Sequence, residues 1–264
     1  MVVLLKRNLG AFTGGTAVGT LGGLIGLGGA EFRLPLLISA FHFRALEAVI
    51  VNKAMSLTVV AFSLPFRAVS VPFMDVLASW PIIVNVLAGS LLGAWFGADW
   101  ATRLKSQTLF RLIAVLLVGM AFALMFGHGE HGDGTALFSG PAQVVTGIAV
   151  GFAIGVVASI MGVAGGELLI PTLVILFGVD IKLAGSLSLA ISLPTMIVGF
   201  TRYSRDGSFA VLKTNKTFVM AMAAGSIVGA LIGSLLLGIV DERLLLPMLA
   251  AILIISSVKV WKHG

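Results

Sequence analysis

The chain has 264 residues, of which 58% are hydrophobic and 11% are charged, and its mean hydropathy is +1.11. Soluble domains carry roughly 25% charged residues, so too few polar side chains remain here to cover a water-facing surface. The formal net charge of +6 is explained by basic residues, which collect in the cytoplasmic loops of membrane proteins. No nucleic-acid-binding motif accompanies it, so no nucleic-acid partner is expected. Cysteine is absent, which excludes disulfides, thiol catalysis and thiolate metal sites. The composition predicts an all-α polytopic protein embedded in the lipid bilayer.

The predicted elements are apolar segments of membrane-spanning length. Lys6 and Arg7 precede the first of them, as in a signal peptide, but no convincing cleavage site follows, so we expect a first membrane segment. Glycines and a proline interrupt the first segment of each half, so its backbone hydrogen bonds fail within the membrane. In chain order, the first half (1–127) holds 10–42, 45–66, 75–100 and 107–126; a polar linker covers 128–139; the second half (140–264) holds 141–178, 182–201, 211–238 and 243–261.

The two halves repeat one unit at a shift of 136 residues. "GLGGAEFRLPLL" at 26–37 aligns with "GVAGGELLIPTL" at 162–173, so that Glu31 meets Glu167 and Pro35 meets Pro171. Further on, "GSLLGAWFG" at 89–97 aligns with "GSIVGALIG" at 225–233. Self-similarity at a fixed period indicates duplicated architecture. Each repeat of about 136 residues is predicted to contain one broken or re-entrant segment and three transmembrane helices.

The distribution of basic residues favours re-entrant hairpins over crossing broken helices. Arg33 and Lys53 are taken as membrane-embedded and left out of the count. If each interrupted segment returns to the side it left, only Arg67, Lys182 and Arg243 of the other fifteen Lys and Arg residues lie outside, against twelve inside. Three crossings per half then insert the second half upside down, as in many secondary transporters. The N- and C-termini are predicted to be cytoplasmic. A long broken helix that crosses the membrane remains the alternative.

The two breaks have the composition of an anion pocket. A helix that starts near Pro35 or Pro171 would direct unpaired N–H groups and a positive dipole end at a bound anion. Glycines permit positive φ and close backbone approach, and a guanidinium is well matched to an oxyanion. The predicted pocket therefore contains the break glycines and one arginine: Gly28, Gly29, Gly165, Gly166 and Arg33.

A carboxylate recurs at each break, as Glu31 and Glu167. Because a carboxylate in hydrocarbon is costly, we expect a role in proton coupling or gating. Ion pairing with Arg33 or Lys53, capping of the broken helix, or mere stabilisation of the turn are the alternatives. Arg33 aligns with Leu169 and has no basic counterpart, so it is either a specificity element or the partner of Glu31.

The helix after each hairpin carries polar residues at spacings that place them on corresponding faces. We expect these side chains to contact the substrate: Asn52, Lys53 and Ser56 in the first half, and Ser188 and Ser192 in the second. Interhelical hydrogen bonding, at about 0.6 kcal/mol each, explains the neutral members equally well.

Other motifs point away from catalysis. The G-S-x-x-G-A-x-x-G pair predicts close helix packing. The glycine-separated acidic and histidine residues at 127–134 predict a solvated connector and no metal site, and Arg202 is expected near a membrane edge where it could guard an entrance. The chain has no P-loop and no hydrolase motif, so neither ATP coupling, another cofactor nor enzymatic activity is expected.

The repeated "GxGG" break with its following proline, together with "GSLSLAISLPTMIVGFTRYSRDG", resembles the TauE/SafE family of sulfite exporter-like permeases over essentially the whole chain. The resemblance implies transport of small sulfur oxyanions or organosulfonates across the bacterial inner membrane. It carries the glycines, both glutamates and both prolines onto the broken segments.

The leading hypothesis is a secondary transporter of a small sulfur-containing anion that works by alternating access between inverted halves, with Glu31 and Glu167 coupling transport to protons. A passive anion channel is the alternative, and a membrane scaffold for an enzyme is a third reading. The expected partners are the anion and the bilayer, and a homo-oligomer is compatible with the sequence.

Overall fold

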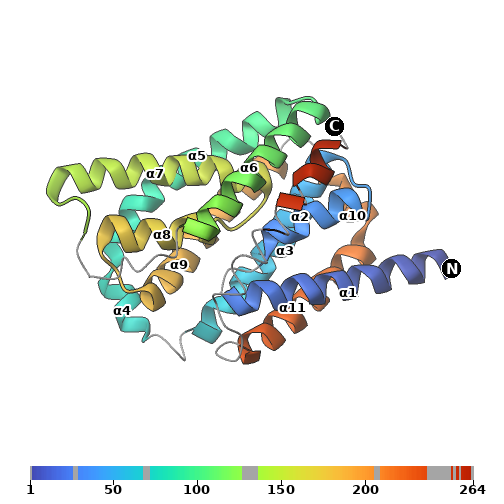
Figure 1. Cartoon of the computed structure of the whole chain (residues 1–264), viewed down its shortest axis with the longest axis horizontal. Helices are drawn as coiled ribbons and strands as arrows, with labels where there is room; N and C mark the ends of the chain where they lie inside the picture. Colours follow the sequence, from blue (N-terminus) through green and yellow to red (C-terminus); the bar gives the residue numbers. More distant parts are fainter. Residues whose placement is uncertain are drawn as a thin grey trace.

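The computed structural model describes residues 2–25, 29–67, 72–126, 136–204, 209–236, 251, 254–255 and 257–262. All regular structure in these ranges is α-helical, which confirms the predicted class (Figure 1). The helices are α1 Val2–Ile25, α2 Ala30–Ser39, α3 Ala45–Arg67, α4 Phe73–Ala78, α5 Trp80–Arg103, α6 Ser106–Phe126, α7 Gly140–Met161, α8 Gly166–Phe177, α9 Ile181–Ser204, α10 Ala210–Thr214 and α11 Lys216–Leu236. Most of the predicted linker and most of segment 243–261 lie outside the described residues.

Five of the described helices are long and apolar enough to cross a membrane. At 1.5 Å rise per residue, about 20 apolar residues span the hydrocarbon core. The qualifying stretches are Ala45–Phe62, Trp80–Arg103, Gly140–Met161, Leu183–Ser204 and Lys216–Gly233. The chain is therefore a multi-pass membrane protein.

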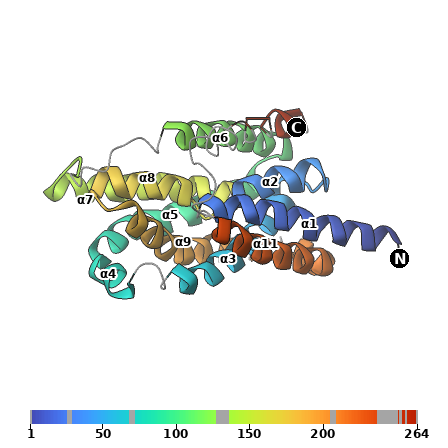
Figure 2. The same cartoon turned by 60° about the horizontal axis from the view of Figure 1, so that its bottom comes forward.

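Each interrupted segment forms an antiparallel pair of one long and one short helix (Figure 2). In the second pair, Gln143 near the start of α7 donates its side-chain N–H to the carbonyl oxygen of Leu176 near the end of α8, at 2.9 Å. In the first pair, Leu36 of α2 packs against Gly14 and Phe41 against Gly10. Each short helix thus returns toward the end where its long partner begins, as the hairpin interpretation expects. α7 is nevertheless long enough to cross by itself.

The short helices begin earlier than the sequence predicts. α2 starts at Ala30 and α8 at Gly166, so Pro35 and Pro171 lie inside these helices, beyond the breaks. The physical reason is that glycine supplies the break: Gly29 (φ 65°) and Gly165 (φ 82°) adopt the left-handed conformation immediately before each helix. Each proline then removes one intrahelical N–H donor from a helix that has already begun.

Two helix pairs approach unusually closely through glycine. Gly15 and Gly19 of α1 face backbone carbonyls of α11, while Gly225 and Gly229 of α11 face those of α1. In the same way, glycines at 89, 93 and 97 of α5 meet α7, and those at 151 and 155 of α7 meet α5. Small residues allow such backbone approach between membrane helices, so the packing role predicted for the G-S-x-x-G-A-x-x-G motif is confirmed.

The helix boundaries recur at the sequence shift of 136 residues. α3 begins at Ala45 and α9 at Ile181, while α5 begins at Trp80 and α11 at Lys216. The same shift carries α1 onto α7, so the α1–α11 pair corresponds to the α7–α5 pair. Both close pairs therefore join a helix from the first half of the sequence to one from the second.

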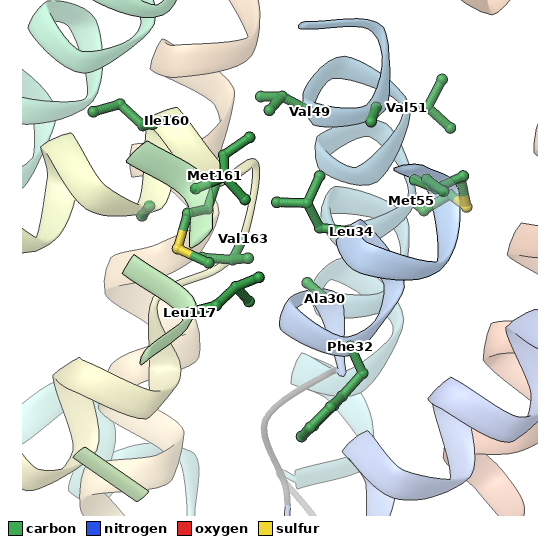
Figure 3. Close-up of a cluster of buried hydrophobic side chains, with 14 of the residues drawn as sticks. Ala30, Phe32, Leu34, Val49, Val51, Met55, Leu117, Ile160, Met161 and Val163 are labelled. Atoms are coloured by element: carbon green, nitrogen blue, oxygen red, sulfur yellow. The ribbon is translucent and has the colours of Figure 1, made fainter. Parts of the chain in front are cut away.

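The centre of the described fold is apolar and surrounds the tips of the hairpins. Figure 3 shows Leu34 of α2 and Val49 of α3 on one side of this cluster, with Met161 and Val163 on the other. All four side chains are buried. This apolar packing excludes water from the polar groups that lie beside it.

Candidate functional site

A buried arginine occupies the inner side of the first hairpin. Arg33 has no solvent exposure, because α2 packs against α3. One guanidinium nitrogen donates to Asn52 Oδ1 at 3.4 Å and to Ser56 Oγ at 3.3 Å. Asn52 and Ser56 are one helical turn apart on α3, so both can face the same guanidinium. The structure thus brings together three of the residues that the sequence singled out.

The polar side chains of α3 also join the tips of the two hairpins. Asn52 Nδ2 donates to the carbonyl oxygens of Ala30 (2.9 Å), at the start of α2, and Met161 (3.2 Å), at the end of α7. Ser56 donates to the Asn52 carbonyl at 2.8 Å and is within 3.4 Å of that of Gly162. The bonds to Met161 and Gly162 satisfy carbonyl groups left open where α7 ends. The site is a convergence of two chain breaks around α3.

The second half contributes a related contact through α9. Ser192, which aligns with Ser56, donates to the carbonyl oxygen of Ala164 at 2.7 Å. Ser188, in contrast, donates to Gly185 within its own helix at 2.9 Å. Ser192 therefore holds the second break, whereas the hydroxyl of Ser188 is used locally.

Left-handed glycines shape both breaks. Gly29 and Gly165 precede the short helices, and Gly162 ends α7 with φ 67°. Gly162 ends that helix in a Schellman pattern, with its own N–H near the Ser159 carbonyl (3.2 Å) and the next N–H near that of Ala158 (3.0 Å). Gly166 is the first residue of α8, and Gly28 lies outside the described residues.

Glu31 is fully buried in the first turn of α2, two residues before Arg33. Both side chains are fully buried, so the two residues share one apolar environment. A negative charge in the first turn of a helix is favoured by the helix dipole. Glu167 occupies the matching turn of α8, but its side chain lies outside the described part of the structure.

Lys53 lies beside the Arg33 group (Arg33, Asn52 and Ser56), because it projects from α3 about 100° from Asn52 and about 60° from Ser56. Its ammonium group donates to Ser159 Oγ of α7 at 2.9 Å and lies 6.0 Å from the centre of the Tyr203 ring of α9. The Tyr203 hydroxyl donates to the Ser159 carbonyl oxygen at 2.9 Å. The predicted site thus extends along α3 from Arg33 to the contacts with α7 and α9.

Sequence reasoning did not identify Ser159, Gly199 or Tyr203. An ideal Cβ on Gly199 would lie 2.5 Å from both Lys53 Nζ and Ser159 Oγ, so a larger residue here would displace one or both of these groups. The sequence offered one weak signal for Tyr203, because it is the only tyrosine in the chain. The structure shows that this tyrosine is fully buried.

Arg202 forms an ion pair with Asp99, with its Nε 3.0 Å from Asp99 Oδ1, and Asp99 also pairs with Arg103 at 2.8 Å. This cluster joins α9 to α5 near their C-terminal ends. Arg202 lies over the Trp95 ring at 5.8 Å. The predicted position of Arg202 near a membrane edge is compatible with this cluster, which links helices that already pack together.

Comparison of the sequence with known proteins identifies its family. The family model described as "Sulfite exporter TauE/SafE" matches residues 9–260. The chain belongs to the TauE/SafE family. A relative in Bacillus subtilis (strain 168), "Probable membrane transporter protein YunE", is 21% identical over 266 residues, covering 95% of this chain and 96% of the relative. No solved structure matches.

This TauE/SafE protein is accordingly a multi-pass membrane transporter. Among the described residues, no group of three or more histidine, cysteine, aspartate or glutamate side chains could hold a metal ion. The site combines two buried basic side chains, Arg33 and Lys53, with the buried carboxyl group of Glu31 and several hydroxyl groups.

Proposed function

We propose that this protein is a secondary transporter that moves a small sulfur-containing anion, such as sulfite or an organosulfonate, across the bacterial inner membrane. The observation that carries the proposal is a fully buried arginine at the tip of a hairpin in a chain of the sulfite exporter family. A buried cation is costly in hydrocarbon and by default marks a substrate or ion pathway.

The anion would bind where the two chain breaks meet α3. Arg33 presents a planar set of donors that fits a sulfonate or sulfite oxygen pair. Asn52 and Ser56, which now share its guanidinium at 3.4 and 3.3 Å, would supply the remaining contacts. These bonds are longer than the 2.7–2.9 Å typical of strong charge-assisted bonds, so the oxygens of a sulfite or sulfonate would compete well for the same guanidinium donors.

The repeated helix boundaries support an inverted-repeat transporter. Both hairpins meet at α3, because Asn52 contacts the start of α2 in the first hairpin and the end of α7 in the second. Opposite insertion of the halves would place these tips near the bilayer midplane, on either side of the bound anion.

Contacts among residues near helix ends support the proposed orientation. Arg7 donates to Asn215 Oδ1 at 2.8 Å, and Arg111 lies over the Trp261 ring at 5.7 Å. Each contact joins two chain regions that the charge distribution assigns to the cytoplasmic side. Both termini are therefore proposed to be cytoplasmic.

The glycine contacts suggest which parts move during alternating access. Rigid halves of the sequence are unsuited to rocking, because α1 is bound to α11 and α5 to α7. We propose two mixed bodies instead: α1–α3 with α10 and α11, and α7–α9 with α4 and α5. The α3–α9 contact lies between them. Lys53 reaches across this boundary to α7 and α9, and Asn52 and Ser56 reach across it to the end of α7.

Transport in proteoliposomes tests the proposal, with radiolabelled sulfite and sulfoacetate as probes. Arg33→Leu should lower affinity by at least about tenfold, the loss expected for a charge-assisted contact of roughly 1.5–3 kcal/mol. Arg44→Leu is the matched control, because Arg44 is exposed. Unaltered affinity in Arg33→Leu would make that arginine a structural partner. Saturable counterflow identifies a carrier, whereas conductance near diffusion rates identifies a passive channel and refutes the proposal.

We assign proton coupling to Glu31 and Glu167, the glutamates that recur at the two breaks. Glu31 is fully buried beside Arg33, so a change in its protonation would change the charge of the site. Glu31→Gln removes the titratable group while keeping the shape. We expect this variant to lose the pH dependence of flux; an unchanged pH profile would remove Glu31 from the coupling mechanism.

A further inference from the structure

We propose that Lys53, Ser159 and Tyr203 form a second anion-binding site beside the Arg33 group, on the side of α3 that faces α7 and α9. This inference rests on the proposed function, because the occupant is the transported oxyanion. The second site joins three helices: Lys53 comes from α3, Ser159 from α7 and Tyr203 from α9. Nothing in the sequence pattern assigned the last two residues to a site.

The first argument is the charge of Lys53. Its side chain is 1% exposed, and in the described part of the chain it takes part in no ion pair. Its described polar contact is the 2.9 Å bond to the Ser159 hydroxyl, which adds no negative charge. An ammonium group has three donors, and burying it without a counter-ion costs several kcal/mol. An anion would supply a counter-charge and acceptors for the other N–H groups.

The second argument is the construction around the ammonium group. Gly199 lacks the Cβ that would otherwise lie 2.5 Å from Lys53 Nζ, so α9 admits the charge against its backbone. Tyr203 fixes Ser159 by donating to its carbonyl oxygen at 2.9 Å. The face of its ring, 6.0 Å from Nζ, favours a cation. Three residues from two helices thus position one ammonium and one hydroxyl donor.

The third argument is location. Lys53 reaches from α3 to α7 and α9, which belong to the other of the two proposed bodies. An anion that enters or leaves by separating these bodies passes the contact that Lys53 makes with Ser159. Because a lysine is a flexible point charge whereas arginine imposes a planar geometry, the second site would attract small oxyanions by charge, and the Arg33 group would select among them.

Binding of sulfite to the detergent-solubilised full chain tests the second site, measured by calorimetry and by the upward shift of the melting temperature. We expect Lys53→Met to weaken binding by roughly 10- to 100-fold, while Lys53→Arg retains binding. Gly199→Ala, which keeps the lysine but displaces its ammonium group, should also weaken binding. Lys213→Met is the matched control, because Lys213 is exposed.

The Arg33→Leu variant separates this inference from the proposed function. Two sites predict that Arg33→Leu keeps part of the sulfite-induced stabilisation and that the double variant with Lys53→Met loses it. Wild type that binds no sulfite contradicts the proposed function, and the second site with it. If Lys53→Met leaves sulfite binding unchanged, the second site is overturned and the proposed function is not. The same holds if Arg33→Leu and Lys53→Met each abolish sulfite binding completely, because the two residues would then belong to one site. A ligand-free Lys53→Met protein that melts well below wild type also overturns the second site, because the lysine would then act only as a structural link to Ser159.

Discussion

Replacing Gly97 with alanine should loosen the contact between α5 and α7. An ideal Cβ at this position would lie 2.6 Å from the carbonyl oxygen and 2.8 Å from the Cα of Val156. Ordinary contact of a Cβ begins at 3.4 Å, so the helices must separate by up to about 0.8 Å. Both neighbouring atoms belong to backbone, and no side-chain rotation can relieve the overlap. The separation would also weaken the neighbouring contacts at Gly89 and Gly93.

The expected magnitude follows from two opposing terms. Overpacking in a close-packed interior costs about 1–3 kcal/mol, and the greater helix propensity of alanine offsets about 1 kcal/mol of this. Because the overlap is with backbone, we expect a net loss of roughly 1–2 kcal/mol. At about 2–4 °C per kcal/mol for a chain of this size class, the melting temperature should fall by several degrees.

Gly119→Ala provides the matched control, because no atom lies within 4 Å of an added Cβ at Gly119 of α6. That variant should gain helix propensity and melt at or slightly above wild type. Thermal unfolding of both purified variants in detergent, followed by far-ultraviolet circular dichroism, makes the comparison. If Gly97→Ala melts at or above Gly119→Ala, the glycine contact does not limit the approach of α5 and α7, and the reasoning about mixed bodies loses its basis.

Two further substitutions test hydrogen bonds that join distant helices. Tyr203→Phe removes the donor to the Ser159 carbonyl (2.9 Å), so we expect a loss of about 1 kcal/mol in thermal unfolding; an unchanged melting temperature would show that this bond contributes nothing. Ser90 and Thr195 join α5 to α9 through a hydroxyl pair at 2.8 Å. The double-mutant cycle of Ser90→Ala and Thr195→Val should give a coupling energy near 0.6 kcal/mol, whereas strictly additive effects would argue against the pair.

Local sequence chemistry was sufficient to predict the chain breaks. Glycines before Ala30 and Gly166 allow positive φ. A charged residue within an apolar membrane segment is costly whatever its tertiary neighbours are. These are properties of a few neighbouring residues, so they can be read without knowing their partners. The same reasoning misplaced the helix starts near Pro35 and Pro171, because a proline tolerated in the first turn was taken as the boundary itself.

Composition, the repeat of 136 residues and the breaks with their buried charges were determined by the sequence alone. The partners were decided only by tertiary structure. Lys53 and Ser159 are 106 positions apart, and Arg7 and Asn215 are 208 apart, so no local pattern relates them. Self-similarity showed that two units exist but did not show that α1 pairs with α11 and α5 with α7. This pairing between the two halves depends on how closely the glycine-lined helix backbones approach. That distance is a property of the packed helices and cannot be read from the sequence of either helix alone.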